Sequence, residues 1–196
     1  MSTAFNEEHR TAIRVARASD AKAVQAIYSP YVTDTAISFE LEPPSAEEMG
    51  RRMSTILERY PWLVYELDGR IAGYAYACAH RERAAYVWSA DSAVYIASDA
   101  HRRGIGRALY RRLAAILDLQ GVHTVHGGVT LPNQGSVGLH EACGFRHVGV
   151  YREVGYKLGA WHDVGWWALR LNSPASDPQP LTPFAQALFE QASEIR

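Results

Sequence analysis

The sequence predicts an α+β fold in which helices flank a mixed, mostly antiparallel sheet. The stretch WLVYELDGRIAGYAYA holds two β-rich runs around Asp68-Gly69, a pair that favours a two-residue hairpin turn. Segments with the apolar spacing of helices lie both before and after this hairpin. Strands and helices therefore alternate along the chain, as they do when helices pack on a sheet.

The first third of the chain supplies one strand and two helices. TAIRVARA alternates apolar and charged residues, which is typical of an outer strand. Ser19 and Asp20 stand where a helix cap belongs, ahead of AKAVQAIYSPYV. Ser45 and Glu48 form a capping box. The helix that this box opens carries one apolar side, made of Met49, Met53, Ile56 and Leu57.

The middle of the chain continues with a third main strand, over about residues 85–96. A glycine turn follows and leads into a helix that Gly121 is placed to end. Its apolar residues recur every four positions, at Ile105, Leu109, Leu113 and Leu117.

The last third predicts a strand in VHTVHGGV, a helix over residues 133–143 that Gly144 terminates, and two long strands around a turn near 158–160. A proline-rich stretch follows Asn172 and precedes a short amphipathic segment around Phe184 and Leu188. We expect an N-terminal tail over residues 1–10, one domain over 11–172, and a C-terminal tail with a short helix over 173–196. Whether that helix docks on its own subunit or on another stays open.

Composition places the chain among ordinary globular proteins. Its 196 residues suffice for one domain, and a net charge of −1 gives no general attraction to nucleic acid or to anionic membranes. No apolar run reaches the roughly 18 residues of a membrane span, and the first residues lack a secretion pattern, so we expect a cytoplasmic protein. Cys78 and Cys143 are expected to be reduced and buried. No metal is expected, because four histidines lack ligand spacing: His123, His126, His147 and His162.

The segment HRRGIGRAL combines two glycines and three arginines at the start of a helix. The first amides of a helix have no partner within it and carry the positive end of its dipole, so such a turn suits a pyrophosphate. An ordinary strand-to-helix turn with solvated arginines is the alternative. A Walker loop is excluded because Gly106 is followed by Arg107-Ala108, and a dinucleotide fingerprint because its third glycine would fall at Leu109.

His101 to Gly106 resembles the R/Q-x-x-G-x-G/A acetyl-CoA loop of the GNAT N-acetyltransferase superfamily, with histidine in place of glutamine or arginine. A second signature of that superfamily follows at Asn133, Ser136 and Gly144-Phe145. The stretches RYPWLVYELDGRIAGYAYA, AYVWSADSAVYI, GLHEACGF and GAWHDVGWW resemble the phosphinothricin N-acetyltransferase family and its methionine sulfone and sulfoximine relatives. Together these matches cover roughly residues 11–172.

The resemblance implies a GNAT fold of about seven strands and about four helices, with acetyl-CoA as cosubstrate. In that fold the strand at Val94, Tyr95 and Ile96 offers backbone groups to the pantetheine arm, and one of its N–H groups stabilises the thioester oxygen. The remaining residues implied to hold the cosubstrate are Arg102, Arg103, Gly104, Ile105, Gly106, Arg107, Asn133 and Ser136.

The resemblance also implies two titratable groups near the reacting atoms. Asp91 stands where the family has a glutamate, so its carboxylate is one methylene shorter, and a water can bridge the difference. His140 stands where most of the superfamily has a tyrosine that protonates the leaving thiolate. A solvated loop aspartate and a structural histidine are the alternatives. We expect the two to act as a pair and leave the division of acid and base roles open.

Family substrates are amino acids that carry a phosphinate, sulfone or sulfoximine group. Arg81 and Arg83, with Tyr86, stand where the family binds these groups, and Phe39 is expected to wall the pocket. A solvated connection between strands is the alternative for the arginines. Arg81 replaces a family lysine, so affinity for any one substrate can differ.

Three functions remain in view: acetylation of a small amino acid, acetylation of another amine such as a peptide N-terminus or a polyamine, and acetyl-CoA binding without turnover. The basic HRER segment argues against a polyamine, and the two titratable residues argue against a mere binding module. Relatives are often dimers, so we expect a homodimer. The aromatic residues of the last hairpin are compatible with one: Trp161, Trp166 and Trp167. The natural acceptor is not predicted.

Overall fold

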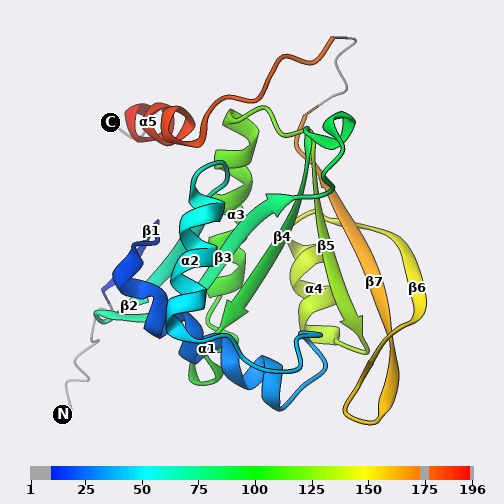
Figure 1. Cartoon of the computed structure of the whole chain (residues 1–196). Coiled ribbons are helices and arrows are strands. Elements are labelled where there is room, and N and C mark those ends of the chain that lie inside the picture. Colours follow the sequence, from blue (N-terminus) through cyan, green and yellow to red (C-terminus); the bar gives the residue numbers. More distant parts are fainter. Residues whose placement is uncertain (1–9, 173–176, 195–196) are drawn as a thin grey trace, which may run out of the picture.

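The computed structural model describes residues 10–172 and 177–194, and its centre is a seven-stranded sheet in the order β1-β2-β3-β4-β5-β7-β6 (Figure 1). Neighbouring strands are antiparallel except β4 and β5, which are parallel. The strands are β1 (Thr11–Val15), β2 (Trp62–Leu67), β3 (Arg70–Ala79), β4 (Ser89–Ile96), β5 (Thr124–Leu131), β6 (Arg146–Lys157) and β7 (Ala160–Arg170). The predicted α+β class and mostly antiparallel sheet are confirmed.

Helices cover both faces of the sheet. They are α1 (Ala21–Thr33), α2 (Ala46–Leu57), α3 (Ile105–Leu119), α4 (Gln134–Ala142) and α5 (Phe184–Glu194). α1 and α2 lie on one face, whereas α3 and α4 lie on the other (Figure 1). Each face has its own hydrophobic core, because successive strand residues point to opposite sides: Tyr74 of β3 packs with α1 and α2, and Ala75 with α3.

Several local predictions are confirmed by backbone geometry. Asp68 and Gly69 both adopt left-handed conformations, with φ of 51° and 80°, as a two-residue hairpin turn requires. Half of the predicted capping box is present: the Ser45 hydroxyl accepts a hydrogen bond from the backbone N–H of Glu48 at 3.1 Å, whereas the Glu48 carboxylate bonds Arg51 and Arg52. Gly121 ends its helix at φ 84°.

Two element predictions are wrong in detail. β4 begins at Ser89 rather than near residue 85, because Ala84–Tyr86 forms a short 3₁₀ turn. The side chain of Asp20 does not cap α1. Its carboxylate instead accepts hydrogen bonds from the Arg14 guanidinium and the Arg17 backbone, which lowers the pKa of Asp20.

The described residues contain the four predicted helices that flank the sheet, and the short helix expected in the C-terminal tail is a fifth, α5, which packs on its own chain. α5 lies against α3, with Phe184 and Ala187 buried between them, and the Thr182 N–H bonds the carbonyl of Gln120. Of the predicted tails, residues 1–9, 173–176 and 195–196 lie outside the described residues.

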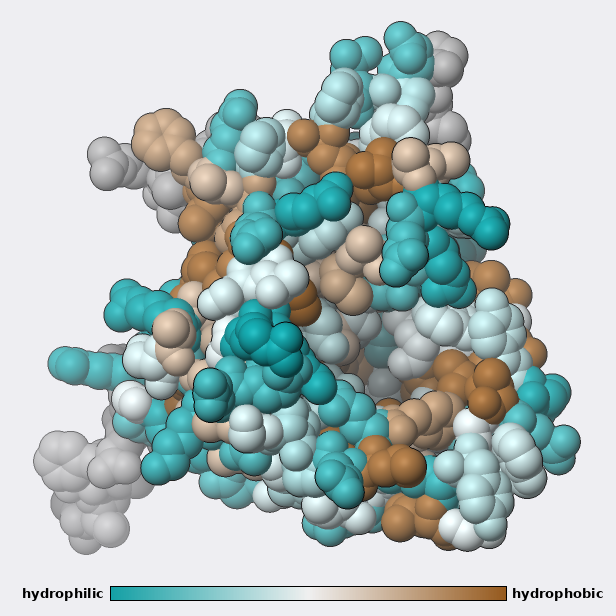
Figure 2. Space-filling model, in the orientation of Figure 1, coloured by the Kyte–Doolittle hydropathy of each residue, from teal (hydrophilic) through white to brown (hydrophobic). Residues whose placement is uncertain are grey.

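The sheet opens between β4 and β5. Only three residue pairs join them, Ser89 with Thr124, Ala90 with Val125 and Asp91 with His126. Beyond these pairs the strands diverge, while β5 stays paired with β7 along its whole length (Figure 1). The backbone of residues 92–96 is therefore left with β3 on one side and a gap on the other, and Figure 2 shows the molecular surface hollowed over this gap.

Candidate active site

The gap between β4 and β5 forms a cavity that reaches residues from both faces of the sheet. On the α1 side its lining includes Ile37, Tyr95 and Thr130. On the α3 and α4 side it includes Tyr110 and His140. The backbone of β4 along this gap is the element that the family resemblance assigns to the cosubstrate.

The glycine turn lies where β4 leads into α3. Arg102 and Gly104 adopt left-handed conformations, with φ of 60° and 78°, and α3 begins at the next residue. Arg102, Arg103 and Arg107 are exposed, and a Cβ built on Gly104 would meet no atom within 4 Å. The backbone of residues 102–104, at the start of α3, is thus exposed beside three guanidinium groups, an arrangement that fits a diphosphate.

The side chains of Ile105 and Gly106 have packing roles. Ile105 is buried in the α3 core, and a Cβ on Gly106 would lie 2.8 Å from Cδ2 of Leu139 on α4. Gly106 thereby permits α3 and α4 to approach each other. The predicted contribution of both residues to cosubstrate binding is limited to their backbone.

The side chains at the end of β4 are also engaged in packing. Val94 and Ile96 pack against the α3 core, while the Tyr95 ring lies in an aromatic cluster with Tyr28 and Tyr74. Only backbone groups of these residues remain for the pantetheine arm and the thioester oxygen.

His101 ties the glycine turn to the end of β4. Its Nε2 lies 3.1 Å from the Ile96 carbonyl oxygen, which also accepts a 2.6 Å hydrogen bond from the Tyr31 hydroxyl. The histidine that departs from the usual loop sequence therefore holds the turn against the end of β4.

Asn133 and Ser136 have a structural role in addition to the predicted one. The Asn133 side-chain oxygen accepts a hydrogen bond from the Ser136 backbone N–H at 3.0 Å, which caps the start of α4. Both residues also line the gap.

His140 is 2% exposed and has hydrogen-bond partners at both ring nitrogens. Nδ1 lies 2.8 Å from the Ser136 carbonyl oxygen and so carries the hydrogen, while Nε2 accepts from the Tyr110 hydroxyl at 3.0 Å. Gly127 makes room for this ring, since any Cβ there would clash with it. Burial lowers the pKa of His140, against a smaller opposing effect of the Ser136 carbonyl, so the imidazole is neutral at pH 7.

This buried neutral histidine makes stability depend on pH. Its pKa lies below the ordinary 6.5 in the folded chain only, so the stability that it contributes is complete above about pH 6.5 and is lost as the pH falls through the folded pKa. We expect the free energy of unfolding to fall less between pH 7 and pH 5 in His140→Gln than in the wild type. Denaturant titrations at both pH values measure this, with exposed His147→Gln as the control. Equal decreases in wild type and His140→Gln would contradict it.

Asp91 and His140 lie on opposite faces of the sheet. Asp91 pairs with Cys78 and shares the α1 and α2 face with Tyr95, whereas His140 packs behind β5 with Tyr110. They do not contact each other and can act together only through the gap. The joint role of Asp91 and His140 in the reaction stays a prediction.

The predicted substrate residues form two separate groups. Arg81, Arg83 and Tyr86 line one cavity, together with His80 and Glu82. Phe39 lies elsewhere, against Gly155 and 6.2 Å from the His162 ring centroid, where the α1–α2 loop meets the β6–β7 hairpin. The structure does not bring Phe39 into the arginine cavity.

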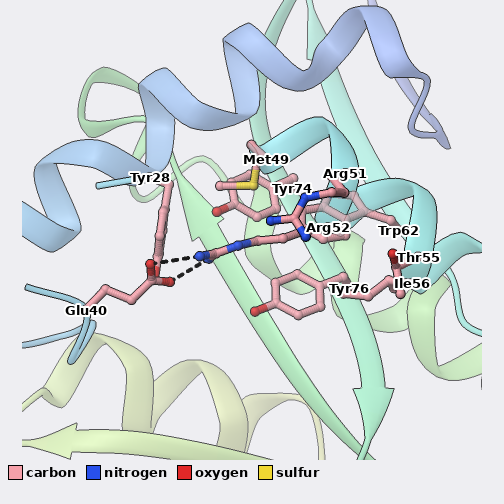
Figure 3. A pocket seen from close by; sticks show the side chains of 10 residues that line it. All are labelled: Tyr28, Glu40, Met49, Arg51, Arg52, Thr55, Ile56, Trp62, Tyr74 and Tyr76. Carbon is pink, nitrogen blue, oxygen red and sulfur yellow. Dashed lines mark hydrogen bonds and ion pairs between the residues drawn. The ribbon is translucent and has the colours of Figure 1, made fainter. Parts of the chain in front are cut away.

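The loop that carries Phe39 is held firmly. Figure 3 shows Glu40 paired with Arg52 of α2, beside Tyr28, in a pocket that α2 shares with the sheet. From the other side, Lys157 donates 2.6 Å hydrogen bonds to the carbonyls of Val32 and Ser38. Because the Arg52 guanidinium is satisfied by Glu40 and Glu48, we interpret this pocket as a structural anchor of the loop.

Sequence reasoning missed three residues that the fold places at the site: His80, Tyr110 and His126. His80 bonds Asp91, Tyr110 bonds His140, and His126 stacks on His80. His126 was considered only as a metal ligand, and within residues 10–172 and 177–194 no group of three potential ligands is placed to hold a metal. In the same described part of the chain, no helix is long and apolar enough to cross a membrane.

Comparison with known proteins agrees with this geometry. Residues 13–166 match the family described as acetyltransferase (GNAT) domain. The chain is 39% identical over 180 residues to a phosphinothricin N-acetyltransferase of Streptomyces viridochromogenes, covering 92% of this chain and 98% of that one. It is 30% identical to an L-methionine sulfoximine/L-methionine sulfone acetyltransferase of Pseudomonas paraeruginosa, over 85% of this chain and 98% of that one.

Among solved structures, a GNAT superfamily phosphinothricin acetyltransferase from Sinorhizobium meliloti in complex with acetyl-CoA superposes with a TM-score of 0.81 at 31% identity. The match covers 89% of this chain and 98% of that one. The fold and its opened sheet are those of an acetyl-CoA-dependent N-acetyltransferase. The chain belongs to the GNAT family and is such an enzyme, with relatives named for phosphinothricin and for methionine sulfoximine and sulfone.

Proposed function

We propose that this enzyme acetylates the α-amino group of a small amino acid whose side chain ends in a phosphinate, sulfone or sulfoximine group. The observation that carries this proposal is the cavity of Arg81, Arg83 and Tyr86, which adjoins Asp91 through His80. Guanidinium groups bind tetrahedral oxygen-bearing groups through paired N–H donors. Glu82 is the single acidic residue among the cavity's six lining residues, so a polyamine would meet excess positive charge there.

The proposed chemistry uses the two faces of the gap differently. Acetyl-CoA supplies the thioester, and backbone N–H groups of β4 stabilise the charge that develops on its oxygen. On the α1 and α2 face, Asp91 and the groups bonded to it remove the proton of the attacking amine. On the other face, neutral His140 acts through the Tyr110 hydroxyl, because its own nitrogens are both engaged.

Replacing Arg81 or Arg83 with alanine tests the substrate class. Each change removes a charged donor, worth about 1.5–3 kcal/mol where it bonds an ionic group, so we expect KM for methionine sulfone to rise about tenfold or more. KM for acetyl-CoA is expected to stay near the wild-type value, because the cavity lies on the opposite side of Asp91 from the glycine turn.

Steady-state kinetics with each ligand varied in turn measures this difference, and exposed Arg111→Ala on α3 is the control. Equal increases of both KM values in the Arg81 and Arg83 variants would exclude a role specific to the amino acid.

We propose further that the enzyme acts as a homodimer through β6. This strand is the outer edge of the sheet, and the last hairpin exposes a series of large apolar side chains. They are Val148 (64% exposed), Tyr151, Val154, Tyr156 (59%), Leu158 and Trp161 (62%). Exposed apolar edges of this kind are typical of interfaces, and sedimentation velocity measures the expected dimer mass.

A further inference from the structure

The imidazole of His80 connects Asp91 with the arginine cavity. Its Nδ1 lies 2.6 Å from Oδ1 of Asp91, and the same side chain lines the cavity with Arg81 and Arg83. Asp91 itself does not line that cavity. The group nearest to the proposed amino acid is therefore the histidine rather than the carboxylate.

Three aromatic rings fix the orientation of the His80 ring. His126 stacks on it with centroids 4.5 Å apart and 23° between the planes. Tyr86 and Trp166 meet it edge-on, at 5.8 Å and 6.4 Å. These neighbours come from three elements, the 3₁₀ turn, β5 and β7, so a rotation of the ring would disturb packing on several sides.

The hydrogen bond to Asp91 determines which nitrogen is basic. A carboxylate accepts, so Nδ1 of neutral His80 carries the hydrogen and Nε2 carries the free lone pair. Nε2 has no hydrogen-bond partner among residues 10–172 and 177–194. An aspartate that holds a histidine in this tautomer and stabilises its protonated form is the arrangement by which Asp–His pairs make general bases.

The stacked His126 does not compete for this proton. Burial and the neighbouring charges of His80 and Arg81 lower the pKa of His126, although Asp91 opposes them. The titratable and charged groups around His80 are thus the carboxylates of Asp91 and Glu82, an imidazole that stays neutral at pH 7, the phenol of Tyr86 and the guanidinium groups of Arg81 and Arg83.

We propose that His80 is the proton acceptor of the reaction and that Asp91 positions it. This inference rests on the proposed function. The substrate ammonium gives one proton to Nε2 of His80, and the neutral amine nitrogen then forms the C–N bond with the acetyl carbon while the C–S bond breaks. The nitrogen loses its second proton, and coenzyme A leaves as the thiolate. The imidazolium, held by Asp91, then returns the proton to solvent, and the thiolate takes one up. His80 thereby bridges the distance that the short Asp91 side chain leaves.

The alternative is that Asp91 accepts the proton through a water and His80 is only its neighbour. These two mechanisms predict different activities for the His80→Gln variant. The amide of His80→Gln can still donate to Asp91 but cannot accept a proton at neutral pH, so the carboxylate keeps a partner while the base is lost.

For His80→Gln we expect kcat at pH 7 to fall at least about tenfold, the lower part of the usual range for general bases. KM for acetyl-CoA is expected to change by less than about twofold. The deficit should shrink toward pH 9, because the amine then loses its proton without help. Thiol release over pH 6–9 measures this, with His123→Gln, at the residue just before β5, as the control. A kcat within about twofold of wild type at pH 7, or a loss equal at pH 7 and pH 9, would overturn the proposal.

A second variant tests the distance argument. Adding Asp91→Glu to His80→Gln lengthens the carboxylate by one methylene, so kcat should rise above that of His80→Gln alone. No increase would overturn the bridging role. The amine used is whichever one the wild type acetylates fastest, so a wrong acceptor class is seen in the wild type alone and leaves the His80 comparison interpretable.

Discussion

Asp91→Asn is expected to lower kcat/KM at least about tenfold while the enzyme still binds acetyl-CoA. The amide keeps the size of the side chain but loses the negative charge that holds the Nδ1 hydrogen of His80 and stabilises a proton at this site. The Asp91 side chain is 26% exposed, and its one side-chain hydrogen bond among the described residues goes to His80, so the loss of its charge should cost little stability.

Thiol-release kinetics and thermal melts measure both properties, with exposed Asp118→Asn as the control.

On the other face of the gap, His140→Gln and Tyr110→Phe should each lower kcat, because they break the same hydrogen bond. Alanine at position 140 is less suitable, since it would leave a cavity beside Phe145 and Trp167. Wild-type kinetics in both Asp91→Asn and His140→Gln would exclude both residues from the chemistry.

The double variant Arg102→Ala/Arg103→Ala is expected to raise KM for acetyl-CoA about tenfold or more and to leave KM for the amine nearly unchanged. Both guanidinium groups are exposed beside the open helix start of α3, so each adds attraction for a diphosphate. Their removal leaves the backbone N–H groups at the start of α3 in place, so acetyl-CoA binding should weaken rather than vanish.

Isothermal titration with acetyl-CoA measures the affinity directly, and the matched double variant Arg111→Ala/Arg112→Ala, further along α3, controls for the loss of charge. Because the attraction is electrostatic, the difference from wild type should also decrease at high salt. Identical affinities of wild type and the Arg102/Arg103 variant at low salt would show that the turn does not hold the diphosphate.

Local signals in the sequence were sufficient for the hairpin and the glycine turn. Asp68-Gly69 requires left-handed backbone at two adjacent positions, and few residue pairs tolerate it. Gly104 likewise needs φ of 78° just before α3. In both cases the conformation depends on adjacent residues, so it could be predicted without the rest of the fold.

The contacts around Asp91 depend on tertiary structure and have no local signal in the sequence. His80 reaches Asp91 because β3 and β4 are antiparallel neighbours. His126 reaches His80 because the register of β4 and β5 places His126 beside Asp91. Tyr110 occupies a buried position on the apolar side of α3, where a tyrosine predicts core packing. The separation of Asp91 from His140 follows from which face each side chain occupies, and the gap that joins them is a property of the whole sheet.

The most direct test of the proposed acceptor is a thiol-release assay of the wild-type enzyme with acetyl-CoA against a panel of amines. The panel contains methionine sulfone, methionine sulfoximine, phosphinothricin, unmodified methionine, spermidine and a short peptide. Recognition by the cavity of Arg81 and Arg83 predicts the highest kcat/KM for one of the first three, with unmodified methionine well below it. Turnover of spermidine or the peptide in preference to all three would contradict the account.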